Sequence, residues 1–201
     1  MSKVHIVTDS ASTIKPAFAE EFDVTILPLT VRIGDKEYQD GANLDHEELL
    51  LCMTSERIRP KVVGPTAEQF KQAYDRLTNH TDQIISIHSS AGLSLIHREA
   101  QIAADEFLGR CDIAVIDSET LSLGLSILVR EAASLAKKRL PLNSILRHIR
   151  GTIRRIYIVL TTDTLDYLEH DQLISPAQAI LGAMLGIKPF LSIEEGKIIP
   201  M

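Results

Sequence analysis

Short apolar runs that alternate with helix-patterned segments occupy most of this 201-residue sequence. Four runs have the length and composition of buried strands, at 4–7, 24–31, 84–87 and 113–116. Between them, apolar residues recur at helical spacing, as in the stripe from Phe70 to Leu77. Strands separated by helices are typical of βαβ units. The sequence therefore predicts an α/β fold, with a mainly parallel sheet and flanking helices.

Local signals place further elements around this frame. Gly34-Asp35 separates two short strand-like runs and predicts a hairpin. Thr66 with Gln69 fits a capping box at the start of a helix. Further helices are expected at 17–22, 45–53, 93–107, 125–136 and 142–149.

The pattern changes after about residue 153. A strand at 156–160, a short helix at 164–168 and a hairpin formed by 190–193 and 197–199 are expected there. Ser175-Pro176 predicts a helix start, and Gly186 predicts its end. We therefore expect an N-terminal α/β domain at 1–152, followed by an incomplete second α/β domain at 153–201.

Charge and composition narrow the function. The formal charge of −6 argues against nucleic-acid binding, and the densest basic stretch, 147–155, reads as one helix face that leads into a strand. No apolar stretch is long enough for membrane insertion, and no signal sequence follows Met1. Cys52 and Cys111 lie far apart and read as reduced thiols. These features predict a cytoplasmic protein.

Three of the four predicted parallel strands end in similar polar sequences. The endings are Asp9-Ser10, His88-Ser89-Ser90 and Asp117-Ser118. Ligands of open α/β sheets bind beyond the carboxyl ends of the strands, where hydroxyl groups and helix N-termini can hold an anion. The alternative is that each residue only caps a helix or forms a turn. The recurrence favours a shared site for a carboxylate or phosphate.

A second feature is apolar. Large side chains alternate with small ones along 177–187, where Ile180 and Met184 lie among alanine and glycine residues. Such a surface could accept a long apolar ligand, although ordinary core packing explains the same residues.

Sequence motifs for catalysis are absent. There is no GxSxG elbow, no GxGxxG and no P-loop, and the seven histidines lack metal-ligand spacing. We therefore expect no catalytic residue, no cofactor and no metal.

At several of these positions the sequence resembles the DegV family of bacterial fatty-acid-binding proteins. The resemblance runs through 6–10, 24–31 with Asp40-Gly41, 86–94, 117–124, 163–168, 174–175 and 187–189. It implies two α/β domains with a long-chain fatty acid between them and its carboxylate bound by hydroxyl groups. It also implies a lipid-binding subunit that offers this carboxylate to a separate fatty acid kinase.

The resemblance assigns lipid binding to a set of residues in this chain. They are Ser10, Val62, Ser89, Ser90, Gly92, Leu93, Ser94, Ser118 and Leu173. Two of them depart from the family pattern, because Val62 replaces a threonine and Leu173 replaces an arginine. The chain also ends at Met201, before the length expected of the family, which suggests a shortened or truncated member.

Two other functions stay open. The chain could be a ligand-free interaction module that docks on a partner protein or self-associates through exposed apolar surface. It could also be a small hydrolase or phosphotransferase that uses Asp9, His88 and Asp117.

Overall fold

The computed structural model describes residues 3–55, 59–162, 165–170, 174–175 and 190–201. Its central sheet has four parallel strands in the order β2-β1-β6-β7. These strands are β1 (His5–Asp9), β2 (Val24–Leu27), β6 (Gln83–His88) and β7 (Asp112–Asp117). The predicted α/β class and the parallel sheet are confirmed.

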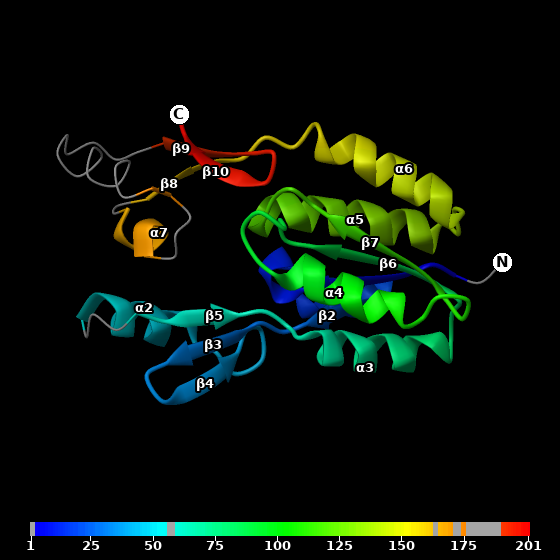
Figure 1. Ribbon diagram of the computed structural model, residues 1–201, viewed down its shortest axis with the longest axis horizontal. Coiled ribbons are helices and arrows are strands. Elements are labelled where there is room, and N and C mark those ends of the chain that lie inside the picture. Colours follow the sequence, from blue (N-terminus) through cyan, green and yellow to red (C-terminus); the bar gives the residue numbers. More distant parts are fainter. Residues whose placement is uncertain (1–2, 56–58, 163–164, 171–173, 176–189) are drawn as a thin grey trace.

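Helices cover both faces of this sheet (Figure 1). One face packs against α1 (Pro16–Phe22), α5 (Ser122–Lys137) and α6 (Leu142–Ile153). The other packs against α3 (Ala67–Thr78) and α4 (Ile96–Asp105). Successive side chains of β6 point to opposite faces, so that Ile85 and Ile87 join the first core and Ile84 joins the second. This double burial explains why the strand sequences are continuously apolar.

A small antiparallel sheet follows β2. Its order is β4-β3-β5, built from β3 (Thr30–Ile33), β4 (Lys36–Gln39) and β5 (Lys61–Val63), with α2 (His46–Ser55) inserted between the last two. The predicted hairpin is confirmed, and Gly34 adopts a positive φ of 58° at its turn. Thr66 also forms the expected capping box with Gln69 at the start of α3.

The single strand predicted at 24–31 is wrong. It divides at Pro28-Leu29 into β2 and β3, which belong to different sheets. Proline has no N–H to donate to a ladder, and the Leu29 N–H donates instead to Ser10 Oγ at 3.0 Å. The Leu29 carbonyl accepts from the Asp40 N–H at 2.8 Å, which fixes the exit from the central sheet.

A third sheet lies in the C-terminal part. It has the antiparallel order β10-β9-β8, from β8 (Val159–Thr161), β9 (Phe190–Glu194) and β10 (Lys197–Pro200). The hairpin predicted at 190–199 is confirmed, whereas the strand predicted at 156–160 begins three residues later. The short helix is α7 (Asp166–His170). The helix predicted at 176–186 lies outside the described residues.

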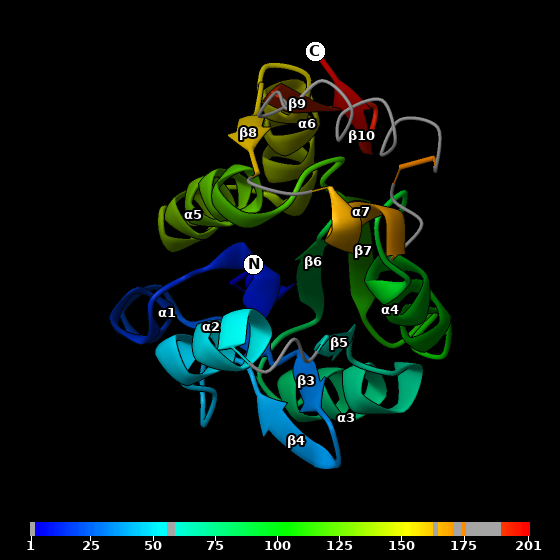
Figure 2. The ribbon, with the colours of Figure 1, turned by 90° about the vertical axis from the view of Figure 1, so that its left-hand side faces the viewer.

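Both small sheets lie beyond the C-terminal ends of the parallel strands, on opposite sides of them (Figures 1 and 2). We call this end of the central sheet the strand-exit edge. The third sheet carries a small core of its own, formed by Ile174, Leu191, Ile193 and Ile198. The strand exits of the central sheet therefore lie between the two projections.

Two helical glycines test the packing of this fold. A β-carbon on Gly124 in α5 would collide with the Thr120 hydroxyl oxygen and lie 2.8 Å from Ile158 Cδ1, whereas one on Gly151 in α6 would meet nothing within 4 Å. We expect Gly124→Ala to lower the free energy of unfolding by roughly 1–3 kcal/mol through overpacking. Gly151→Ala should raise it by about 1 kcal/mol, because alanine is the better helix former. Equal effects in urea titrations of the two variants would contradict this packing.

Candidate ligand-binding site

The three polar strand exits meet at one edge, because β1, β6 and β7 are neighbours in the central sheet (Figure 2). The carboxylate of Asp9 accepts from the backbone N–H of Ser89 at 3.4 Å, which joins the β1 and β6 exits. The Ser118 N–H donates to the His88 carbonyl at 3.1 Å, which joins the β6 and β7 exits. Backbone and side-chain bonds therefore hold the exits in register.

A buried chain of polar side chains lies directly behind this edge. His88 Nδ1 lies 2.9 Å from Asp9 Oδ2, and His88 Nε2 lies 2.6 Å from Ser86 Oγ. The Tyr74 hydroxyl donates to Ser86 Oγ at 2.8 Å. Donation in a single direction, from Tyr74 to Asp9, satisfies every member of the chain. Burial raises the pKa of the Tyr74 hydroxyl well above its usual range, although its bond to Ser86 acts in the opposite sense.

This chain has a structural role. All four residues are buried, and the edge of the Phe70 ring packs against the imidazole with its centroid 4.9 Å away. Both nitrogens of His88 are occupied, so the imidazole has no open position for a substrate. Asp117 in turn accepts from the N–H groups of Ala91 and Glu119 through one carboxylate oxygen. The hydrolase hypothesis gains no support from this arrangement.

Two of the serines expected at the site use their hydroxyl groups to fix the loops. The Ser90 hydroxyl donates to the Gly196 carbonyl at 2.7 Å and accepts from the Gly92 N–H at 3.1 Å. The Ser118 hydroxyl donates to the Thr120 carbonyl at 3.1 Å. Both side chains are fully buried. Their donor capacity is used by the fold, because a hydroxyl has a single proton to donate.

Ser89 and Ser94 form a different arrangement. Their hydroxyl oxygens lie 3.2 Å apart at the exit of β6, and Ser94 is only half-buried. Two hydroxyls that share one hydrogen bond retain one proton between them for another acceptor. Ser94 lies in the turn before α4, where its N–H donates to the Ser90 carbonyl at 3.0 Å. The pair can therefore donate one hydrogen bond to an anionic oxygen at the strand-exit edge.

Exposed apolar side chains occur in two segments near this pair. Leu95 follows Ser94 and is 67% exposed, and Val62 on β5 is 58% exposed. The end of β5 lies close to the start of α4, because Gly64 leaves room for Ile96. A hydroxyl pair beside exposed apolar side chains suits a ligand with a polar head and an oily body.

The remaining residues predicted to bind lipid lie in different parts of the chain. Leu93 packs against the core of the third sheet, and Gly92 lies so close to the Gly196 carbonyl that a β-carbon would be 2.5 Å from its oxygen. Both position the loop after β6. Leu173 lies outside the described residues.

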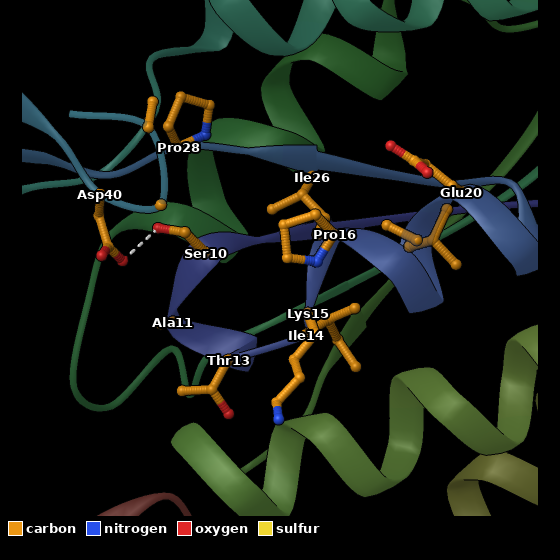
Figure 3. Close-up of a pocket in the computed structure, with 14 residues that line it drawn as sticks. Ser10, Ala11, Thr13, Ile14, Lys15, Pro16, Glu20, Ile26, Pro28 and Asp40 are labelled. Carbon is orange, nitrogen blue, oxygen red and sulfur yellow. Dashed lines mark hydrogen bonds between the residues drawn. The ribbon is translucent and has the colours of Figure 1, made fainter. Parts of the chain in front are cut away.

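Ser10 faces a separate hollow on the other side of β1 (Figure 3). Its hydroxyl donates to Asp40 Oδ2 at 2.7 Å and accepts from the Leu29 N–H. The cavity has a volume of about 680 Å³ and is lined from η1 (Ser10–Ser12), α1, β2 and residues 40–42. Neither Ser89 nor Ser94 lines this cavity. Ser10 therefore fixes the loop after β1 and is not part of the site around the hydroxyl pair.

His97 is the titratable ring beside this site. Burial lowers the pKa of its imidazole, while the Asp117 carboxylate acts in the opposite sense. Within the described ranges, no three histidine, cysteine or acidic side chains are grouped as a metal site would require. In the same part of the chain, no helix has the length and apolar character needed to cross a membrane.

The fold defines a three-layered α/β protein whose polar strand exits meet at one end of the central sheet. A family model described as an uncharacterised protein of the DegV family matches residues 3–201. The chain is 35% identical, over 195 residues, to a DegV domain-containing protein of Deinococcus radiodurans, covering 97% of this chain and 69% of that relative. The chain belongs to the DegV family.

Solved structures agree with this assignment. A DegV family protein from Thermus thermophilus, described for its fatty-acid binding, superposes with a TM-score of 0.89 at 29% identity, covering 99% of this chain and 70% of that one. DegV from Bacillus subtilis, described as a fatty acid binding protein, gives a TM-score of 0.89 at 26% identity, covering 100% and 71%. The family predicted from the sequence is confirmed.

The buried chain of polar side chains predicts a large effect at His88. We expect His88→Ala to lower the free energy of unfolding by roughly 3 kcal/mol or more, because it removes the imidazole donor to the buried Asp9 carboxylate, the acceptor of the Ser86 hydroxyl, and a packed ring. His97→Ala is the matched control, since His97 is half-buried and makes no side-chain hydrogen bond in the described part of the chain. Chemical denaturation of both variants measures the difference, and equal losses would contradict the structural role of His88.

The lowered pKa of His97 also predicts a pH effect. The folded protein holds this proton less tightly than the unfolded chain, in which the imidazole has its ordinary value of 6.5. Stability contributed by the neutral ring is therefore present above that pH and is lost as the pH falls through the folded-state pKa. We expect His97→Gln to flatten the acid limb of the curve of unfolding free energy against pH. An unchanged limb would contradict the expected pKa.

Proposed function

We propose that this protein is a carrier of long-chain fatty acids and is not an enzyme. The observation that carries the proposal is the Ser89–Ser94 hydroxyl pair, which has a proton to donate at the mouth of the strand-exit edge. The carboxylate of the ligand binds there and the acyl chain runs away along apolar surface. Burial of the chain supplies affinity at about 0.8 kcal/mol per methylene, and the hydroxyl pair sets its orientation.

The relatives support the choice of ligand. The structures from Thermus thermophilus and Bacillus subtilis are both described as binding fatty acids, and both align with nearly the whole of this chain. Stearic acid is named in the description of a further neighbour, from Eubacterium ventriosum, which supports the shared fold.

The proposed site differs in strength from that of the family. Ser89 and Ser94 are neutral donors, and the resemblance places Val62 and Leu173 where the family has a threonine and an arginine. Charge-assisted hydrogen bonds are roughly twice as strong as neutral ones, so this chain should hold a carboxylate more weakly than its relatives.

The proposed architecture has two parts. Residues 1–152 form the N-terminal domain and 153–201 form part of a second domain, with the acyl chain between them. The separate core of the third sheet supports this division. The carrier works in the cytoplasm without a cofactor or metal, and it offers the carboxylate to a separate fatty acid kinase.

An alternative function rests on a different surface. Four exposed apolar side chains line one groove of about 620 Å³, between the start of α5 and β8: Leu123, Ile127, Tyr157 and Val159. Exposed apolar surface of this kind favours association, so a ligand-free module that self-associates is the second candidate. A monomer in sedimentation velocity, combined with intact lipid uptake, would exclude it.

Lipid uptake tests the leading proposal. We expect native mass spectrometry to detect one bound oleate or palmitate in the protein, and the double variant Ser89→Ala/Ser94→Ala to bind about tenfold or more weakly, because the carboxylate loses its donors. Ser134→Ala is the control, since the Ser134 hydroxyl only donates to the Arg130 carbonyl on α5.

A gain of function completes this test. We expect Val62→Thr to tighten oleate binding by about tenfold, because it restores the hydroxyl that the family resemblance places at the head group, with little change in size. The fatty-acid proposal fails if the wild-type protein takes up no fatty acid. The assignment of the head group fails if uptake occurs but is indifferent to all three positions.

A further inference from the structure

Helix α6 presents two contrasting faces. Its inner face is buried against the central sheet through five residues, Leu142, Ile145, Leu146, Ile149 and Thr152. Its outer face carries Arg147 and Arg150, and Arg154 follows at its C-terminal cap, all of them exposed. Spacings of three and four residues place these arginines in one row along the helix. We call this row the arginine face.

The arginine face is electrostatically unpaired. Within the part of the chain that the structure describes, its three guanidinium groups make no ion pair and no side-chain hydrogen bond. Several other exposed cations are paired, among them Lys3 with Asp23, Lys71 with Glu106 and Lys137 with Glu21. Glu131, an acidic group that faces α6 from α5, is bound instead by His148 and by the Thr152 hydroxyl. The arginine face is therefore a local concentration of positive charge in a chain with a net charge of −6.

The surroundings favour an acidic protein as the partner. Arginine presents a planar fork that pairs with carboxylates through two parallel hydrogen bonds, and it is enriched at protein interfaces. A membrane-binding helix would need exposed large apolar side chains among the basic ones, and α6 has none. A nucleic acid would need a more extensive basic surface, because its affinity comes from contacts with many phosphates.

The position of the arginine face connects it with the strand exits. Arg150 and Arg154 line a hollow of about 290 Å³ together with Asp117 and Glu119, at the exit of β7. Arg154 also borders a second hollow, of about 580 Å³, which Ser118 and Thr120 line from the same exit. Figure 1 shows α6 running over the central sheet toward this edge. A protein seated on α6 would reach the rim of the strand-exit edge.

We propose that the arginine face is a docking surface for an acidic segment of a protein partner. Arg147, Arg150 and Arg154 bind carboxylates of that segment, whose acidic side chains repeat at matching intervals. Asp117 and Glu119, which share a hollow with Arg150 and Arg154, repel further acidic groups and so limit the segment at the β7 end. The docking surface does not depend on the proposed function. Only the further claim, that the bound partner lies next to the lipid head group, rests on it.

The test uses a fluorescently labelled helical peptide with glutamate at every third and fourth position, and the same peptide with glutamine instead. We expect fluorescence anisotropy to show binding of the glutamate peptide only, weakened by added salt. Arg147→Glu/Arg150→Glu/Arg154→Glu should weaken it by about tenfold or more. The control is Lys15→Glu/Lys36→Glu/Lys138→Glu, which makes the same charge change at three exposed, unpaired lysines on separate elements. It should retain most of the binding.

Conservative variants and other polyanions test how specific the interaction is. Arg147→Lys/Arg150→Lys/Arg154→Lys keeps the charge but removes the planar fork, and it should weaken binding several-fold. Equal losses in the control and the arginine-face variants, or no binding of the glutamate peptide, would overturn the proposal. So would tighter binding to a DNA duplex or to phosphatidylglycerol vesicles. Oleate uptake by the arginine-face variant should equal that of the wild type, which separates this proposal from the lipid-binding one.

Discussion

The buried contact between His88 and Asp9 is the interaction on which the strand-exit edge depends. It joins the ends of two neighbouring strands, β1 and β6, at a place where both chains leave the sheet. The carboxylate of Asp9 also accepts from the N–H groups of Ala11 and Ser89, so that it orders the first residues of both loops. A buried carboxylate needs this number of donors, because an unpaired charge away from water is costly. The same bonds that satisfy Asp9 set the position of Ser89.

Hydroxyl groups at the edge divide into two kinds by their partners. Those of Ser90 and Ser118 donate to backbone carbonyls: Ser90 joins its loop to Gly196, which is distant in sequence, and Ser118 closes a turn with Thr120. Those of Ser89 and Ser94 bond to each other and retain a donor at the mouth of the edge. The loop after β6 thus contains both a hydroxyl that fixes the fold and a hydroxyl pair with one proton left to donate. The arginine face of α6 lies beside this edge, since Arg150 and Arg154 share a hollow with Asp117 and Glu119 at the exit of β7.

Much of the fold could be predicted from the sequence, because its signals are local. Continuous apolar strands separated by helices indicated the parallel sheet, and the DegV resemblance followed from blocks spread along the chain. The break at Pro28-Leu29 was missed, although a proline within an apolar run is itself a signal against a continuous strand. β5 is three residues long with mostly exposed side chains, and its pairing with β3 depends on tertiary contacts that no local pattern reveals.

The site was harder to predict, because identical residue types have different roles there. Sequence order cannot tell that Ser90 bonds to Gly196, more than one hundred positions away, while Ser89 bonds to Ser94 nearby. The convergence of the polar exits could be predicted, since parallel topology alone brings them to the same end of the sheet. The packing of the third sheet against the loop after β6 decides which hydroxyl has a proton left to donate to a ligand. That information lies in tertiary structure.

A crystal structure of the protein grown with a bromine-labelled long-chain fatty acid tests the central claim most directly. The account predicts a carboxylate oxygen within hydrogen-bonding distance of Ser89 Oγ and Ser94 Oγ, with the anomalous signal of bromine between the central sheet and the third sheet. A carboxylate bound instead in the hollow beside Ser10 and Asp40, or a site beside Ser89 that stays empty under saturating ligand, would contradict it.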